Sequence, residues 1–153
     1  MTTICIIDTS IFCNILGVPN RAQRQQQALA ELKEFLEQGA TLLLPLATIF
    51  ETGNHIAQNG DGRMRRLVAE KFVKQVGQAF SGEAPWTPTP MQNIDEIMVW
   101  LEEFPDCAMR EMGFGDLSIL KVFENQCALH TSRRVLIWSY DQHLRIYDQP
   151  PSI

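Results

Sequence analysis

The chain lacks the sequence features of several protein classes. No apolar run approaches the roughly 18 residues that a membrane-spanning helix needs. The start of the sequence, residues 1–4, lacks the basic region and the long apolar stretch that are typical of a secretory signal. The four cysteines form no CxxC pair and have apolar neighbours, which favours buried thiols in a reducing compartment over a zinc site. Internal repeats and domain linkers are also missing. These absences predict one soluble domain over 1–153, in the cytoplasm and without a membrane partner.

An excess of positive charge is missing as well. The chain has 13 basic and 18 acidic residues, which gives a net charge of −5. A protein that binds nucleic acid through bulk charge alone is normally basic, so simple electrostatic coating of nucleic acid is excluded. A nuclease is not excluded, because a metal site concentrates carboxylates. With 45% hydrophobic residues in 153, the chain is able to bury a substantial core.

Short apolar runs alternate with helical patterns along the chain. The runs predict buried strands at 3–7, 41–44 and 135–138. Helices are predicted at 10–16, 21–38, 45–57, 63–80, 93–104 and 116–127. The proline-rich segment 81–92 has room for a short edge strand, and the tail from about 148 is predicted to be irregular. This pattern predicts an α/β fold with a mostly parallel central sheet flanked by helices, a Rossmann-like three-layer arrangement.

Three acidic residues follow the predicted strands. Asp8 comes directly after the first strand and Asp141 lies just beyond the last one. Glu51 belongs to the helix that leaves the second strand, at the border of its apolar stripe. In an open parallel sheet, ligands bind outside the carboxyl ends of the strands. Each residue alone is typical of a turn, a cap or a helix flank, but together they predict an acidic rim.

Asp116 is a fourth acid in an unusual place. On a helical wheel it shares a face with Ile119, Leu120, Phe123 and Cys127, so an ionisable group begins an inward-facing stripe. Buried carboxylates need partners or a metal. A helix N-cap is the ordinary alternative, but Ile119 stands where a capping box has Glu or Gln.

Four carboxylates on one rim would repel one another, and their pKa values would rise unless a cation neutralised them. Carboxylate oxygens with few nitrogen or sulfur donors nearby suit Mg²⁺ or Mn²⁺ better than zinc. His55 lies one turn after Glu51 and is a further, weaker candidate for this site. The acidic residues therefore predict a divalent-metal site.

These residues stand in four segments whose order resembles that of the PIN domain family, which includes the VapC-type toxins of toxin–antitoxin pairs. The segments are Ile6-Ile7-Asp8-Thr9-Ser10, Ile49-Phe50-Glu51, Gly113-Phe114-Gly115-Asp116-Leu117-Ser118-Ile119 and Trp138-Ser139-Tyr140-Asp141. The resemblance extends from Thr3 to about Tyr147, and it rests on the ordered set because no single segment is specific. The chain is longer than compact members of the family around 61–92.

The resemblance implies a Mg²⁺- or Mn²⁺-dependent endoribonuclease that leaves a 5′-phosphate and a 3′-hydroxyl. It implies that Asp8, Asp116 and Asp141 are metal ligands and that Glu51 binds the metal directly or through water. Thr9 or Ser10 would orient Asp8, and Ser139 would act beside Asp141 or contact phosphate. The family also implies RNA as substrate, an antitoxin protein as a partner if the chain is a toxin, and a homodimer.

A basic helix face is the candidate for RNA binding. Arg63, Arg66 and Lys74 lie opposite the apolar stripe of the predicted helix 63–80. Phosphate contacts need such side chains, although a solvated helix face has the same pattern.

Two other functional classes stay open. One is a non-catalytic PIN-fold module that binds RNA or protein, although such members usually lose one or more of the acids. The other is a different phosphoryl-transfer hydrolase, but the haloacid-dehalogenase type needs a second Asp where this chain has Ser10.

Overall fold

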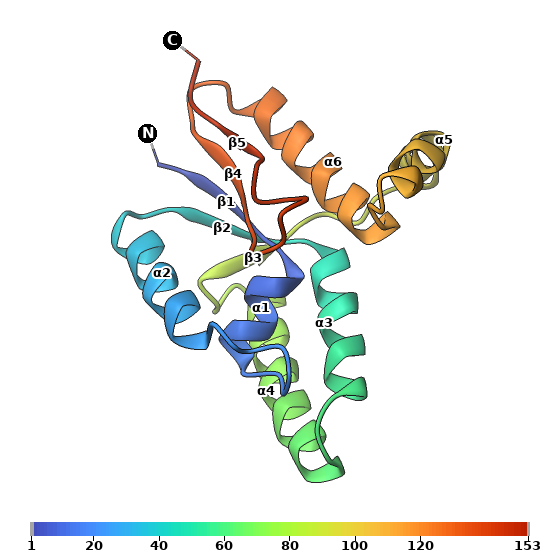
Figure 1. The fold of residues 1–153 in the computed structure, drawn as a ribbon. Helices are drawn as coiled ribbons and strands as arrows, with labels where there is room; N and C mark the ends of the chain where they lie inside the picture. Colours follow the sequence, from blue (N-terminus) through green and yellow to red (C-terminus); the bar gives the residue numbers. More distant parts are fainter. Residues whose placement is uncertain (1, 153) are drawn as a thin grey trace.

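Helices and strands alternate along the chain in the computed structural model, which describes residues 2–152 (Figure 1). The elements are β1 (Ile4–Ile7), α1 (Thr9–Leu16), α2 (Gln25–Glu37), β2 (Thr41–Leu44), α3 (Leu46–Gln58), α4 (Gly62–Phe80), β3 (Trp86–Pro88), α5 (Ile94–Met109), α6 (Phe114–Leu129), β4 (Val135–Trp138) and β5 (Asp148–Gln149). The short edge strand expected within 81–92 is therefore present as β3. Among the described residues, no helix combines the length and the apolar character that crossing a membrane requires.

The sheet has the strand order β3-β2-β1-β4-β5, with β1 at its centre. Parallel pairing joins β1 to β2 and β4, and β2 to β3, so the carboxyl ends of these strands lie at one edge. Only β5 runs antiparallel, and it pairs with β4. The predicted α/β class with a mostly parallel sheet is confirmed.

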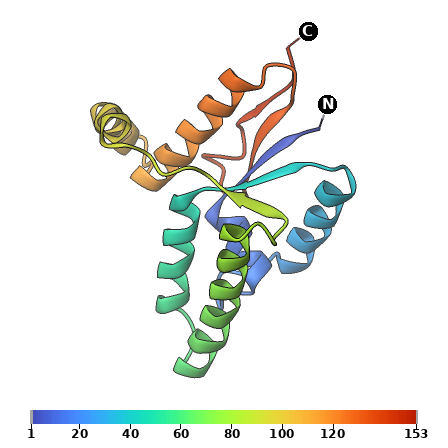
Figure 2. The ribbon, with the colours of Figure 1, turned by 180° about the vertical axis from the view of Figure 1, so that it is seen from behind.

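Helices cover both faces of the sheet (Figures 1 and 2). Along β1, Cys5 and Ile7 pack into the same core as side chains of α1 and α2, whereas Ile4 and Ile6 pack with Phe123 of α6. All residues of β1 and β4 are buried, as expected for strands that are covered on both sides. The arrangement is compatible with a three-layer α/β fold.

The segment before α2 differs from the prediction. The helix expected over 21–38 begins only at Gln25, because the preceding residues form turns. Gly17 and Asn20 have positive φ values of 75° and 64°, and the Arg21 N–H donates to the Val18 carbonyl. Both residues precede the predicted start at Arg21, and glycine and asparagine tolerate this left-handed region best. Residues 21–24 continue the turns, and the Arg24 N–H donates to the side chain of Asn14 in α1. The turns place 17–24 outside both neighbouring helices.

The helix predicted to stop at Pro105 continues to Met109. Proline removes one helical hydrogen bond and crowds the carbonyl four residues earlier, which belongs to Leu101 on the exposed side of α5. Beyond the proline, Cys107 is buried in a cluster with Trp100 and Leu117. Packing of this apolar cluster against α6 compensates for the missing bond.

The tail expected to be irregular from about 148 begins with the two-residue strand β5, and residues 150–152 have no regular structure, as expected. Asp148 and Gln149 pair with the outer edge of β4. The Arg134 guanidinium donates two hydrogen bonds to the Asp148 carboxylate, at 2.8 and 2.6 Å, and holds the short strand in place. A two-residue strand has no hydrophobic pattern of its own, so the sequence alone did not reveal it.

Candidate functional site

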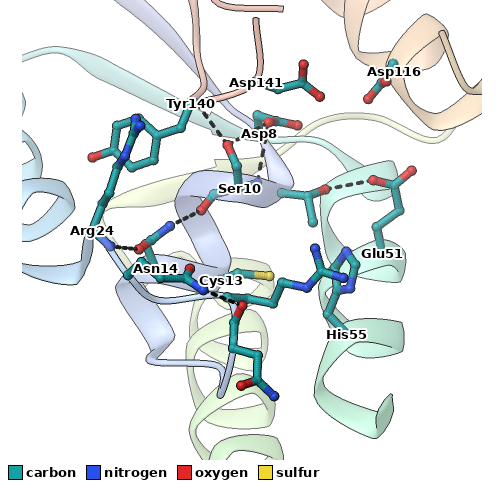
Figure 3. Close-up of a pocket in the computed structure, with 14 residues that line it drawn as sticks. Asp8, Ser10, Cys13, Asn14, Arg24, Glu51, His55, Asp116, Tyr140 and Asp141 are labelled. Atoms are coloured by element: carbon teal, nitrogen blue, oxygen red, sulfur yellow. Dashed lines mark hydrogen bonds between the residues drawn. The ribbon is translucent and has the colours of Figure 1, made fainter. Parts of the chain in front are cut away.

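A polar cleft of about 530 Å³ opens at the carboxyl edge of the sheet (Figure 3). All four predicted acids line it: Asp8 after β1, Glu51 in α3, Asp116 in α6 and Asp141 after β4. Figure 3 shows the side chains of Asp8, Asp116 and Asp141 directed toward one another, with Glu51 beside them. Residues far apart in the sequence meet here because β1 and β4 are parallel neighbours and end together.

Asp8 is the most deeply buried member of the site, with 3% of its surface exposed. It is the N-cap of α1, and its carboxylate accepts hydrogen bonds from the hydroxyls of Ser10 at 2.9 Å and Ser139 at 2.6 Å. Burial raises the pKa of Asp8, and the hydrogen bonds from the two serines partly oppose that rise. The two hydroxyls therefore fix both the position and the charge of this carboxylate.

Ser139 connects two of the acids. Its hydroxyl donates to Asp8 and accepts a hydrogen bond from the Asp141 N–H at 2.9 Å. The Asp141 side chain in turn accepts from the His143 N–H at 2.8 Å, which closes a turn directly after β4. Ser139 thus lies beside Asp141, where the resemblance put it, and it also holds Asp8.

Thr9 and Glu51 form a second connection across the cleft. The prediction assigned Thr9 or Ser10 to Asp8; the Ser10 hydroxyl binds Asp8, whereas the Thr9 hydroxyl donates to Glu51 at 2.9 Å. Burial raises the pKa of Glu51, the Thr9 hydrogen bond lowers it, and the charge of Asp8 adds to the rise. Gly115 is needed for this arrangement, because a Cβ atom at that position would overlap the Glu51 carboxylate.

Asp116 lies in the first turn of α6, which begins two residues earlier than predicted. The N-cap is Gly113, and α6 begins at Phe114. Further along the predicted face, Ile119 and Phe123 are buried, so the stripe does point inward. Burial raises the pKa of Asp116 to about 6, and the charges of the three other acids add to the rise. Its neighbours therefore leave Asp116 in a field of negative charge.

The donor chemistry of the cleft fits a hard divalent cation. Carboxylate oxygens suit Mg²⁺ and Mn²⁺, and the Cys13 thiol in the cleft is not a competing ligand, since burial raises its pKa to about 11. Within residues 2–152, no group of three or more His, Cys, Asp or Glu side chains is arranged to hold a metal ion as it stands. Mg²⁺ keeps several waters and is usually bound through one or two carboxylates, so it does not need a complete protein cage.

The predicted RNA-binding residues Arg63, Arg66 and Lys74 do not line this cleft. They are exposed on α4, as expected, and Arg66 is already paired with Glu70 at 3.1 Å. Their role in RNA binding stays a prediction. The structure brings the four acids together but leaves the basic helix face outside the acidic cleft.

The sequence reasoning missed the basic residues that do line the cleft. Arg21 and Arg24 belong to the segment before α2, and Tyr140 and Asn14 lie beside them. The segment was expected to be helical, so its arginines had no reason to face the site. The turn residues Gly17 and Asn20 precede the predicted helix start at Arg21, so they do not mark 21–24 as a turn.

His55 also lines the cleft, one turn of α3 beyond Glu51. Its Nδ1 atom is buried without a hydrogen-bond partner among the described residues. Burial lowers the pKa of His55, and the positive charge of Arg21 lowers it further. Both effects favour the neutral form of the imidazole.

No known protein-family model matches the chain, and no curated protein matches it significantly.

Proposed function

We propose that the chain is a PIN-type endoribonuclease that depends on Mg²⁺ or Mn²⁺. The observation that supports this function best is the convergence of Asp8, Glu51, Asp116 and Asp141 in one cleft, where burial, together with the charges of the other three acids, raises the pKa of Asp116 to about 6. Such crowding is costly in a structure that only needs to fold. It is expected of a site that binds a cation and a phosphodiester.

Asp8, Asp116 and Asp141 would hold the cation, and Glu51 would bind it directly or through water. When bound by these residues, a divalent cation would lower the pKa of water and offset charge on the phosphoryl and leaving oxygens. The proposed products carry a 5′-phosphate and a 3′-hydroxyl.

The remaining polar residues fix the carboxylates before any substrate arrives. Ser10 and Ser139 hold the Asp8 carboxylate from two sides, and Thr9 holds Glu51. Hydrogen bonds to ligating carboxylates orient those carboxylates, and the loss of such a bond typically lowers metal affinity about 10- to 100-fold. The proposed function thus assigns a role to each hydroxyl that touches the acids.

The test is cleavage of an end-labelled structured RNA with Mg²⁺ or Mn²⁺. Wild type is compared with Asp116→Asn and with the matched control Asp106→Asn, which changes an exposed acid of α5 outside the cleft. We expect cleavage by wild type and control, abolished by a chelator, and none by Asp116→Asn. Equal cleavage by all three proteins would contradict the proposal.

A non-catalytic binding module is the second candidate; it would need no metal ligands, and residues 2–152 contain no ready-made group of three. Calorimetric titration with Mn²⁺ separates the two functions. A nuclease binds Mn²⁺ through a site that Asp8→Asn removes. RNA binding without cation binding would support the module and overturn the nuclease.

A further inference from the structure

The turn between α1 and α2 presents two arginines to the acidic cleft. Arg21 and Arg24 line the same cavity as the four carboxylates. Neither guanidinium forms a salt bridge with an acid within the described part of the chain, whereas Arg66 and Arg134 are paired with Glu70 and Asp148. Two cationic groups in this cleft are therefore free to bind an anion.

This turn is an ordered part of the fold. Val18 is completely buried, and its N–H donates to the Cys13 carbonyl at the end of α1. The side chain of Asn14, 6% exposed, donates to the Ser10 carbonyl at 2.7 Å and accepts from the Arg24 N–H at 2.8 Å. Asn14 thus joins the backbone of Arg24 to the residue that holds Asp8.

The side chain of Arg24 is oriented as well. Its guanidinium carbon lies 5.0 Å from the centroid of the Tyr140 ring, a cation–π contact. The Tyr140 hydroxyl lies 3.2 Å from Glu31 of α2, and Glu31 also accepts a 2.6 Å hydrogen bond from the Trp138 indole. Tyr140 immediately precedes Asp141, so the contact fixes Arg24 next to the acidic rim (Figure 3).

The cleft therefore has charges of both signs on different elements. The carboxylates come from the ends of β1 and β4 and from α3 and α6, while the arginines come from the turn before α2. A cation at the carboxylates would attract one phosphate, and guanidinium groups suit a second one because they bind phosphate oxygens through two parallel N–H groups. A nucleic-acid strand supplies two phosphates in succession.

We propose that Arg21 and Arg24 bind the phosphate next to the one that is cleaved, so that the site selects a polynucleotide strand over a mononucleotide. This inference rests on the proposed function, because it takes the carboxylates as the cleavage site. It also assigns the main basic contact to the turn before α2 instead of Arg63 and Arg66 on α4. Since Arg24 covers the Tyr140 ring, Tyr140 acts by positioning Arg24.

The test measures kcat, KM and their salt dependence on a single-stranded RNA oligonucleotide. The double variant Arg21→Gln/Arg24→Gln is compared with wild type and with Lys33→Gln, an exposed residue of α2 outside the cleft. We expect KM to rise at least about 10-fold with kcat nearly unchanged, and the slope of log(1/KM) against log[salt] to fall by about 0.7, as for one neutralised phosphate on a single strand. Lys33→Gln should resemble wild type.

Two further double variants test whether the effect comes from the charge of Arg21 and Arg24, and whether RNA instead binds at Arg63 and Arg66 on α4. Arg21→Lys/Arg24→Lys should restore most of the salt slope, because lysine keeps the charge. An unchanged KM and slope in the glutamine variant, with wild-type cleavage intact, would overturn the inference and leave the proposed function standing. The inference would also be overturned if the rise in KM and the fall in salt slope occurred only in the variant Arg63→Gln/Arg66→Gln. A wild type without cleavage or cation binding would overturn both.

Discussion

Asp116→Asn should stabilise the cation-free protein near neutral pH while it removes the response to Mg²⁺. In the folded protein the pKa of Asp116 is about 6, compared with 3.8 as its ordinary value, because of burial and the charges of Asp8, Glu51 and Asp141. A carboxyl whose folded pKa is raised destabilises the folded state when it is ionised. This penalty is small below about pH 4, grows as pH rises toward 6, and is complete above it. Asparagine keeps the shape of the side chain and removes the charge.

The magnitude follows from the change in pKa. A rise from 3.8 to about 6 corresponds to roughly 3 kcal/mol at pH 7.5. Since the side chain is only half-buried, solvent screening reduces this value to about 1–2 kcal/mol. For a chain of this size, that free energy raises the Tm by about 3–6 °C. In wild type, Mg²⁺ at 100 times its Kd would instead add about 2.7 kcal/mol.

The assay is thermal unfolding at pH 7.5 and pH 4, with a chelator or with Mg²⁺, for wild type, Asp116→Asn and the control Asp106→Asn. With chelator, the variant should gain stability over wild type at pH 7.5, and most of that gain should disappear at pH 4. Mg²⁺ should raise the Tm of wild type and control only. A variant whose stability relative to wild type is the same at both pH values would refute the reasoning that Asp116 carries uncompensated charge.

Two further substitutions test the residues that hold the acids. Ser139→Ala removes the 2.6 Å hydrogen bond to buried Asp8 and should raise the pKa of Asp8 further. Calorimetry should show Mn²⁺ binding weakened about 10- to 100-fold. The control Ser81→Ala, which changes an exposed serine, should bind Mn²⁺ as wild type does. Gly115→Ala should lower the cleavage rate by displacing the Glu51 carboxylate with little loss of Tm, since a flexible side chain moves aside. The control is Gly77→Ala, because a Cβ atom added at Gly77 would point into open space. This variant should cleave RNA normally and gain about 0.5–1 kcal/mol of stability from helix propensity. An unchanged cleavage rate in Gly115→Ala would contradict the role of Glu51.

The acidic side of the cleft was predictable because strand ends are visible in the sequence. Buried strands appear as short apolar runs, and parallel strands must end at one edge, so Asp8 and Asp141 had to lie near each other once both strands were recognised. Asp116 was recognised from its helical face. By contrast, the hydrogen bond from Thr9 to Glu51 and the close approach at Gly115 depend on how α1, α3 and α6 pack. No local pattern encodes such contacts between elements.

The basic side was missed for a different reason. The helical pattern extended back to Arg21, whereas in the structure the Arg24 N–H donates to the Asn14 side chain of α1 and α2 begins only at Gln25. The continuation of α5 through Pro105 is the opposite case, in which a local signal for a helix end lost to the burial of Cys107. In both places tertiary packing decided an element boundary that local preference left open or assigned wrongly.

The charge pattern of the cleft explains how a chain of net charge −5 would act on an anionic polymer. Net charge governs coating and long-range attraction, whereas recognition depends on charge within about one Debye length, roughly 8 Å at physiological salt. Without a cation, the carboxylates of Asp8, Asp116 and Asp141 would repel a phosphodiester and oppose the attraction of the two arginines. With a cation bound, both ends of the cleft favour phosphate. Cation and strand would then each raise the affinity for the other by the same factor, because coupling between two binding sites is reciprocal. On the proposed function, an acidic protein of this design would bind RNA mainly when its metal is present, and its negative surface would keep it from coating RNA elsewhere.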